Sequence, residues 1–103
     1  MKLILKGPLK DNLHGLMRKI GYHFQGQSGQ ESSFVRPPRG YPRFHVYLRE
    51  EEDDDLILNL HLDQKRPSYK GTTAHSGEYE GKIVENEVER IKQIFKKEYQ
   101  ETI

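Results

Sequence analysis

Apolar residues between positions 9 and 20 recur three or four places apart. This spacing puts them on one stripe of a helix with about 3.6 residues per turn. Pro8 suits the first helical turn, Asp11 suits the positive end of the helix dipole, and Gly21 suits a helix end. The pattern therefore predicts a first helix whose buried stripe consists of Leu9, Leu13, Leu16, Met17 and Ile20.

A second stripe with the same period runs from about Lys82 to Tyr99. Glutamates lie in its first half and lysines in its last half, which is the order that complements a helix dipole. The segment between residues 64 and 81 is expected to be a loop. The sequence therefore predicts a second helix that buries Ile83, Val84, Val88, Ile91, Ile94 and Phe95.

Elsewhere apolar and polar residues alternate, which is the period of a strand. Residues 2–6 form a short apolar run that Gly7 and Pro8 close. Residues 43–49 and 56–63 alternate on either side of six consecutive acidic residues, so they predict an antiparallel hairpin with a charged tip. Residues 22–35 have strand character around a stretch rich in Gly, Gln and Ser, which predicts either a hairpin of two short strands or one strand interrupted by a loop.

These elements predict a single α+β domain over residues 1–103. The expected order is β-α-β-β-β-α, with an antiparallel sheet and both helices on one face in a two-layer sandwich. The helix-facing side of the second hairpin would hold Phe44, Val46, Leu48 and the alternate leucines from Leu56 to Leu62. The outer face would present Arg43, His45, Tyr47, Arg49, Ile57, Asn59, His61 and Asp63.

A turn at the acidic tip determines which residues of this hairpin lie opposite one another. His45 would face Asn59 or His61 and would lie diagonal to the other one. Asp63 would lie beyond His61 on the same face, in the neighbourhood of Arg43. Imidazole and carboxylate groups are therefore expected to gather at this end of the outer face.

Composition limits the class of protein. The chain has 103 residues, 33% hydrophobic residues and no Cys, which indicates one compact domain without disulfides or thiolate metal ligands. No apolar run approaches the roughly 20 residues of a membrane-spanning helix, and the N-terminus lacks the apolar segment of a signal peptide. A cytoplasmic location without a membrane partner is therefore expected.

The net charge of +1 conceals an uneven distribution. Outside the acidic block at positions 50–55, the chain has 17 basic residues against 10 acidic ones. Cations and aromatic rings alternate in the basic segments, and such groups contact phosphates and stack on unpaired bases. We therefore expect an RNA- or DNA-binding module that uses Arg36, Arg39, Arg43, Tyr47, Lys65, Arg66, Tyr69 and Lys70.

Two other interpretations use four residues of the outer face and the loop after it: His45, His61, Asp63 and His75. In the first they bind a metal ion such as Zn²⁺, because imidazole and carboxylate at alternate strand positions can converge on one ion. In the second they are catalytic and need no cofactor, with two histidines as general base and general acid in phosphodiester hydrolysis and with Lys65, Arg66 or Lys70 stabilising charge on the phosphate. An exposed sheet edge would also allow a homo-oligomer.

The segment from Leu9 to Asp63, a helix followed by three strands, together with the closing helix, resembles the α-β-β-β-α layout of double-stranded-RNA-binding domains and HicA-type toxins. The stretch LMRKIGYHFQGQSGQESSFVRP is similar to the HicA pattern of a helix, a strand, a polar turn and a second strand. The resemblance implies RNA binding. The turn at residues 27–33 contains no His, so the catalytic histidine of HicA toxins has no counterpart. Residues 60–81 resemble a segment of short, uncharacterised bacterial proteins.

Overall fold

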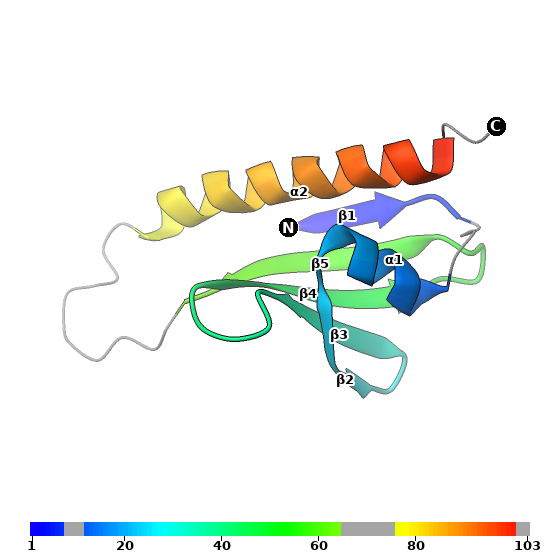
Figure 1. Ribbon diagram of the computed structural model, residues 1–103, viewed down its shortest axis with the longest axis horizontal. Helices are drawn as coiled ribbons and strands as arrows, with labels where there is room; N and C mark the ends of the chain where they lie inside the picture. Colours follow the sequence, from blue (N-terminus) through cyan, green and yellow to red (C-terminus); the bar gives the residue numbers. More distant parts are fainter. Residues whose placement is uncertain (8–11, 65–75, 101–103) are drawn as a thin grey trace.

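A computed structural model describes residues 1–7, 12–64 and 76–100, with only the backbone described for residues 76–80 and 98–100. Within these residues the chain forms five strands and two helices (Figure 1). In chain order they are β1 (Lys2–Leu5), α1 (Leu13–Ile20), β2 (His23–Ser28), β3 (Glu31–Arg36), β4 (Arg43–Glu50), β5 (Leu56–Asp63) and α2 (Ser76–Gln100).

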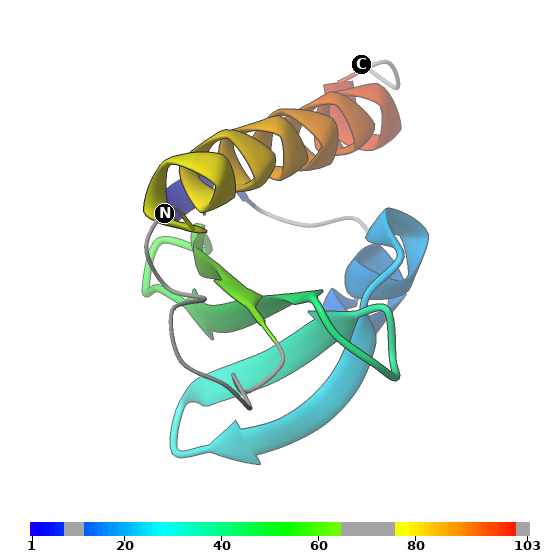
Figure 2. The ribbon, with the colours of Figure 1, turned by 90° about the vertical axis from the view of Figure 1, so that its left-hand side faces the viewer.

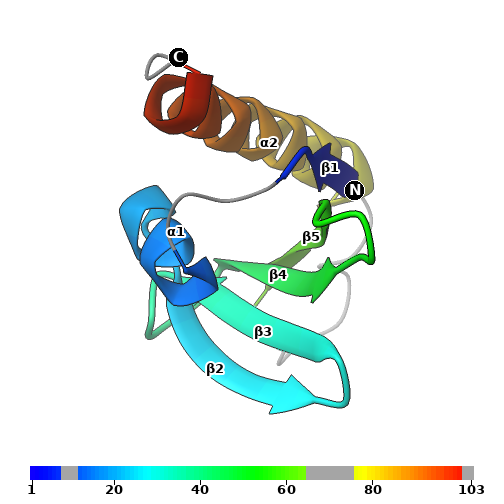
Figure 3. The same cartoon turned by 90° about the vertical axis from the view of Figure 1, so that its right-hand side faces the viewer.

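The five strands form one antiparallel sheet in the order β1-β5-β4-β3-β2. Strands β2 to β5 follow one another as neighbouring hairpins. Strand β1, at the start of the chain, pairs with β5, which is distant from it in sequence. The sheet is strongly twisted, so that β2 and β1 at its two edges point in different directions (Figure 3). Strands β4 and β5 are the longest and lie in its middle.

Both helices lie on the same side of the sheet, and none of the described residues forms a helix on the other side (Figures 2 and 3). Helix α2 contacts β5, and α1 contacts β2 and α2. The predicted α+β fold is therefore confirmed, with its core between the sheet and the helices. That core consists of Leu3, Leu5, Leu16, Met17, Ile20, Tyr22, Phe34, Val46, Leu48, Leu56, Leu58, Leu60, Val84, Val88 and Ile91.

The predicted order contains one strand too few, because residues 23–36 form two strands. Gly29 adopts a φ of 61° in the turn between β2 and β3, a conformation that favours glycine and lets the chain reverse tightly. Of the two alternatives for this segment, the hairpin is the one that forms. Four strands thus follow α1, where the resemblance to double-stranded-RNA-binding domains and HicA-type toxins implies three.

Helix α1 begins four residues later than the apolar stripe predicts. Asn12 has an extended backbone, and its side-chain oxygen accepts a hydrogen bond from the Gly15 amide at 2.7 Å, so Asn12 caps the helix. Residues 8–11, which include the predicted first turn, lie outside the described residues. The predicted helix end is confirmed, because Gly21 has a φ of 101° and its amide donates to the Arg18 carbonyl.

Helix α2 begins at Ser76, six residues before the predicted start. The sequence interpretation took Gly77 and Gly81 as loop residues. Glu78 and Glu80 are good helix formers whose negative charges suit an N-terminal turn, and together with the helix that follows they outweigh the two glycines. The final piece of the predicted loop is therefore helix.

The end of β1 is fixed against the turn between β4 and β5. Asp55 accepts hydrogen bonds from the Lys6 ammonium at 3.0 Å and from the Gly7 amide at 3.2 Å. A Cβ atom at Gly7 would lie 1.9 Å from the Asp54 carbonyl oxygen, so only glycine permits this approach. The acidic tip thus anchors the N-terminal strand in addition to carrying exposed charge.

Candidate functional site

The outer face of the sheet brings together the residues that sequence analysis singled out in the second hairpin. His45 pairs with His61 and Arg43 pairs with Asp63 across β4 and β5. The first pairing is one of the two registers predicted from the turn. The face is buried around His45 and its β3 neighbour Val35, and it is exposed at His61.

His45 lies at the centre of a hydrogen-bonded chain that crosses three strands. Its Nδ1 atom lies 2.9 Å from an Asp63 carboxylate oxygen, and its Nε2 atom lies 2.5 Å from the Ser33 hydroxyl oxygen. A carboxylate only accepts, so Nδ1 carries the proton and donates to Asp63. In the neutral ring Nε2 then accepts from Ser33, and the order of groups is hydroxyl, imidazole, carboxylate.

Sheet register explains why these three side chains meet. Ser33 is opposite Tyr47, two residues beyond His45 on β4, and Asp63 is opposite Arg43, two residues before it. Both are diagonal neighbours of His45 on the same face, within reach of an imidazole ring. A line of polar groups therefore runs obliquely across β3, β4 and β5.

The sequence by itself indicates no functional role for Ser33. The pairing of β3 with β4 is what brings its hydroxyl to His45, and residues 37–42 between these strands contain no pattern that determines their register. The alternation of residues on β3 indicates at most that Ser33 and Val35 share a face. No local signal in the sequence identifies the serine as a partner of the histidine.

A β-bulge in the edge strand brings a fourth polar group to the chain. Pairing between β2 and β3 shifts between Phe24 and Gly26, which leaves Gln25 as the extra residue. Its side-chain amide lies 3.4 Å from the Ser33 hydroxyl oxygen, whose single proton is directed at the nearer His45 Nε2. The hydroxyl therefore has two side-chain neighbours, one imidazole and one amide.

Aromatic rings form a second feature of the same face. The Tyr47 ring stacks on His45 with centroids 4.4 Å apart and an interplanar angle of 25°, and it meets His61 edge-on at 5.7 Å. Arg43 lies over the Tyr41 ring, with its guanidinium carbon 4.8 Å from the centroid. We call Tyr47, His45 and His61 the ring cluster.

The predicted nucleic-acid-binding residues fall into three groups. Arg43 and Tyr47 lie on the outer face, and Arg39 is exposed in the connection between β3 and β4. Arg36 lies on the helix-facing side, where its guanidinium is 3.3 Å from Glu87 of α2 and stacks over Phe44. Outside the described residues lie Lys65, Arg66, Tyr69 and Lys70.

Two cations of the outer face have acidic partners. The Arg43 guanidinium lies 3.4 Å from the Asp63 carboxylate, and Arg49 lies 3.1 Å from Glu51. The Arg49 pair is exposed, so it contributes little to stability and can be exchanged for another anion, whereas the Arg43 side chain is only 16% exposed. Lys2 is an exposed cation of the same face and pairs with Asn59 across β1 and β5.

Glu87 is the centre of a buried polar cluster on the other side of the sheet. It is 4% exposed and accepts hydrogen bonds from Tyr22 at 2.7 Å and from Arg90 at 2.8 Å. Burial raises the pKa of Glu87, but the hydrogen bonds from Arg90 and Tyr22 outweigh it and hold the pKa below its usual range. Desolvation, and then the bond to Glu87, raises the pKa of Tyr22. Arg90 also donates to the Ile20 carbonyl, so the cluster ties α1 to α2.

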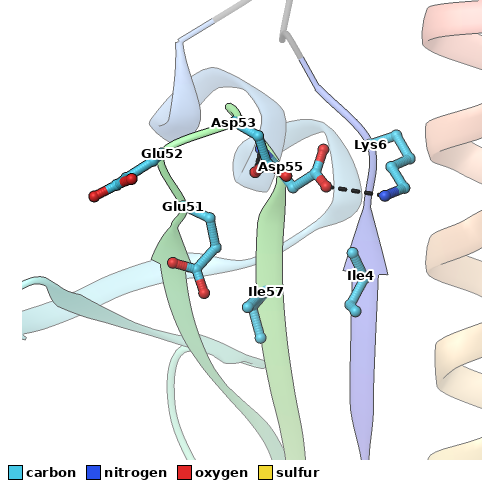
Figure 4. Close-up of a pocket in the computed structure, with 7 residues that line it drawn as sticks. All are labelled: Ile4, Lys6, Glu51, Glu52, Asp53, Asp55 and Ile57. Atoms are coloured by element: carbon cyan, nitrogen blue, oxygen red, sulfur yellow. Dashed lines mark hydrogen bonds and ion pairs between the residues drawn. The ribbon is translucent and has the colours of Figure 1, made fainter.

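The acidic tip of the β4–β5 hairpin surrounds a hollow of about 540 Å³ (Figure 4). Ile4 and Ile57 lie at one end of it, and Lys6 bonds to Asp55 across it. The hydrogen bond from Lys6 lowers the pKa of Asp55, and the same bond raises the pKa of Lys6. The hollow thus contains one internal ion pair, and its remaining acidic lining residues are Glu51, Glu52 and Asp53.

A smaller, more apolar cavity of about 310 Å³ lies where the β3–β4 connection meets α2. Its walls include two prolines of that connection, one residue of α2 and side chains from the adjoining ends of three strands. The residues are Arg36, Pro37, Pro42, Arg43, Phe44, Leu62 and Ile83.

Metal binding was an alternative for the histidines. Among residues 1–7, 12–64 and 76–100, no group of three or more His, Asp or Glu side chains is placed to hold one ion. His75, which that hypothesis requires, lies outside the described residues. In the part of the chain that is described, His45 instead bonds to Ser33 and Asp63.

Comparison with known proteins gives no family for this chain: no family model, curated protein or solved structure matches it. Neither helix, as far as the structure describes them, combines the length and apolar character needed to cross a membrane. Functional inference therefore depends on the chemistry of the outer face.

Proposed function

We propose that the outer face of the sheet binds RNA or DNA in single-stranded form. The observation that carries this proposal is the ring cluster, in which the Tyr47 ring contacts both His45 and His61 on a sheet face that no helix of the described residues covers. Aromatic rings on an open sheet face stack on unpaired bases, and each such contact contributes about 1–3 kcal/mol.

Cations placed around the rings support the proposal. Lys2, Asn59 and Tyr47 lie in one row across β1, β5 and β4, so an amide stands next to the ring and a cation stands one strand further away. Arg49 holds a partly accessible acid, Glu51, which a phosphate can replace. Binding that depends on such contacts weakens as salt concentration rises, because counterions compete for the phosphates.

Fluorescence anisotropy with labelled single-stranded RNA and DNA, titrated over a range of salt concentrations, tests this proposal. Tyr47→Ala is expected to weaken binding by roughly 5- to 100-fold, the equivalent of one stacked base. Phe24→Ala is the matched control, because Phe24 is an exposed ring that packs against His14 and Phe34, away from the ring cluster.

Lys2→Ala is expected to lower the slope of log affinity against log salt by about one, because one phosphate contact is lost. Lys92→Ala, an exposed lysine of α2, should leave that slope unchanged. If neither RNA nor DNA binds at low ionic strength, or if Tyr47→Ala binds as well as Phe24→Ala, the proposal is wrong.

A further inference from the structure

The geometry points to a second activity of the same face, the hydrolysis of a small carboxylic ester through Ser33. The inference is independent of nucleic-acid binding. It starts from the chain Ser33–His45–Asp63, in which a hydroxyl, an imidazole and a carboxylate are joined through the two different nitrogens of one ring. This is the connectivity by which serine hydrolases activate their nucleophile.

The tautomer of His45 is the first requirement for such chemistry. Asp63 accepts a hydrogen bond from the Nδ1–H group at 2.9 Å, so the Nε2 lone pair is directed at the Ser33 hydroxyl. The same carboxylate accepts a 3.4 Å hydrogen bond from Arg43 Nε, which holds the acid in place beside the ring. Asp63 is thus a positioning residue that orients His45 and stabilises the imidazolium form.

Rigidity and access are the second requirement. The His45 side chain is 11% exposed, stacks on Tyr47, and lies between neighbouring strands of a continuous ladder. Its rotamer is therefore held by packing as well as by hydrogen bonds. Ser33 is only half-buried, and its hydroxyl faces the exposed side chain of Gln25, so a small substrate can approach the oxygen atom.

The charges near Ser33 select the substrate class. Among the residues that the structure describes, the two groups beside its hydroxyl are an imidazole and an amide, and the Arg43 cation is directed at Asp63. A phosphodiester carries negative charge and needs a cation at the reacting centre, whereas an uncharged carbonyl does not. The site therefore fits an ester of a small carboxylic acid.

In the first half of the reaction the Ser33 oxygen forms a bond to the carbonyl carbon and its proton passes to His45 Nε2. The electron pair of the carbonyl double bond moves to oxygen. When that double bond re-forms, the bond to the alcohol oxygen breaks, and the alcohol leaves with the proton from Nε2. Ser33 now carries the acyl group.

A water molecule then repeats the sequence. His45 Nε2 accepts a water proton while the water oxygen attacks the acyl carbon, and the bond to Ser33 breaks as the proton returns to the serine oxygen. The sum is ester plus water to carboxylic acid plus alcohol, and no redox partner is required. Gln25 is placed to contribute, because its amide lies 3.4 Å from the serine oxygen and, when turned over, presents an N–H donor to the oxyanion.

The decisive measurement uses the unmodified protein and p-nitrophenyl acetate. We expect rapid release of p-nitrophenolate in an amount comparable to the enzyme, and an acetyl group on Ser33 when the protein is digested and analysed by mass spectrometry. Because this measurement needs no variant, it remains valid if substitutions at His45 disturb folding. Acetylation confined to lysines or to the N-terminus would overturn the inference.

Variants extend the test. Ser33→Ala should lose the burst entirely, and His45→Gln should lower the rate by at least about 100-fold, the lower range for general acid–base catalysis. Ser28→Ala, an exposed serine at the end of β2, should match the unmodified protein. Asp63→Asn should displace the pH–rate profile as well as lower the rate, because it disturbs the tautomer of His45.

A purely structural role for the chain gives a different set of results. Ser33→Ala would then lower the melting temperature and leave ester hydrolysis unchanged. That outcome would overturn the inference while leaving the nucleic-acid proposal in place, since binding is assayed separately through Tyr47.

Discussion

At the scale of single residues, Glu87 shows how a buried charge is accommodated in this small protein. Its carboxylate is 4% exposed and accepts hydrogen bonds from Tyr22, Arg36 and Arg90, which come from three different parts of the chain. A buried carboxylate without partners would be strongly unfavourable, and the partners left behind by its removal would be equally unsatisfied. Glu87 is therefore a residue whose loss affects the whole packing between α1 and α2.

Replacing Glu87 with Gln should lower the free energy of unfolding by about 3 kcal/mol at neutral pH, because Arg90 and Arg36 lose their anionic partner inside the protein. Urea denaturation followed by circular dichroism measures the change. Glu85→Gln, an exposed position on the same helix, is the control and should change stability by less than about 0.5 kcal/mol.

The pH dependence of this difference follows from the lowered pKa of Glu87 in the folded protein. A carboxyl group with a depressed folded pKa contributes its stability above its unfolded pKa, about 4.3, and loses it as pH falls through the folded value. The difference between the unmodified protein and Glu87→Gln should therefore shrink as pH falls below about 4. A difference that stays constant down to pH 2 would contradict the assignment.

At the scale of elements, the two helices depend on different sources of stability. Helix α1 has eight residues, fewer than the roughly 12–15 that an isolated helix needs, so it depends on its caps and on packing. Asn12 and Gly21 supply those caps, and Leu16, Met17 and Ile20 are its buried residues. Helix α2 is long enough to tolerate two glycines in its first turns.

Asn12→Ala should lower the free energy of unfolding by about 1 kcal/mol, because the Gly15 amide loses its side-chain acceptor. For a domain of this size that loss corresponds to a fall of roughly 4–8 °C in melting temperature. Asn86→Ala, in the exposed middle of α2, should have no destabilising effect, since Ala is the better helix former there. Equal melting of the two variants would show that Asn12 does not cap α1.

At the scale of the whole molecule, one face of the sheet carries the core and the other carries the candidate chemistry. Leu58 on β5 is 1% exposed beneath the helices, whereas Ile4 on the neighbouring strand is 51% exposed on the outer face. This division lets polar groups such as Ser33 and Asp63 meet on the outer side without interrupting the apolar packing. The outer face can therefore vary in chemistry while the fold is retained.

Leu58→Ala should cost about 2–5 kcal/mol of unfolding free energy, because it removes a core side chain beneath a layer of helix. Ile4→Ala should cost less than about 1 kcal/mol, since that side chain is half exposed. Thermal or urea unfolding of both variants measures the contrast. Comparable losses would mean that the outer face is covered to a similar degree.

The sequence determined the elements and the face that each strand buries. Alternation in the second hairpin placed Val46 and Leu60 in the core and His45 and His61 on the opposite face, and the structure agrees, although His45 is only 8% exposed on that face. Periodicity is a local property that follows directly from residue order, which is why it could be read without the fold. The starts of α1 and α2 were less predictable. The apolar stripe of the first helix extends back to Leu9, but the helix is capped at Asn12. Gly77 and Gly81 suggested a loop, but the helix propensity of their neighbours prevails.

Only the tertiary structure decided which polar groups meet. Ser33 reaches His45 because β3 pairs with β4 in one particular register, and Gln25 reaches Ser33 because a bulge displaces the edge strand. Arg36, a cation that the sequence assigned to nucleic-acid binding, turns to the other side of the sheet and pairs with Glu87. Register between strands joined by an irregular connection is selected by packing across the whole sheet, and no local pattern of residues specifies it.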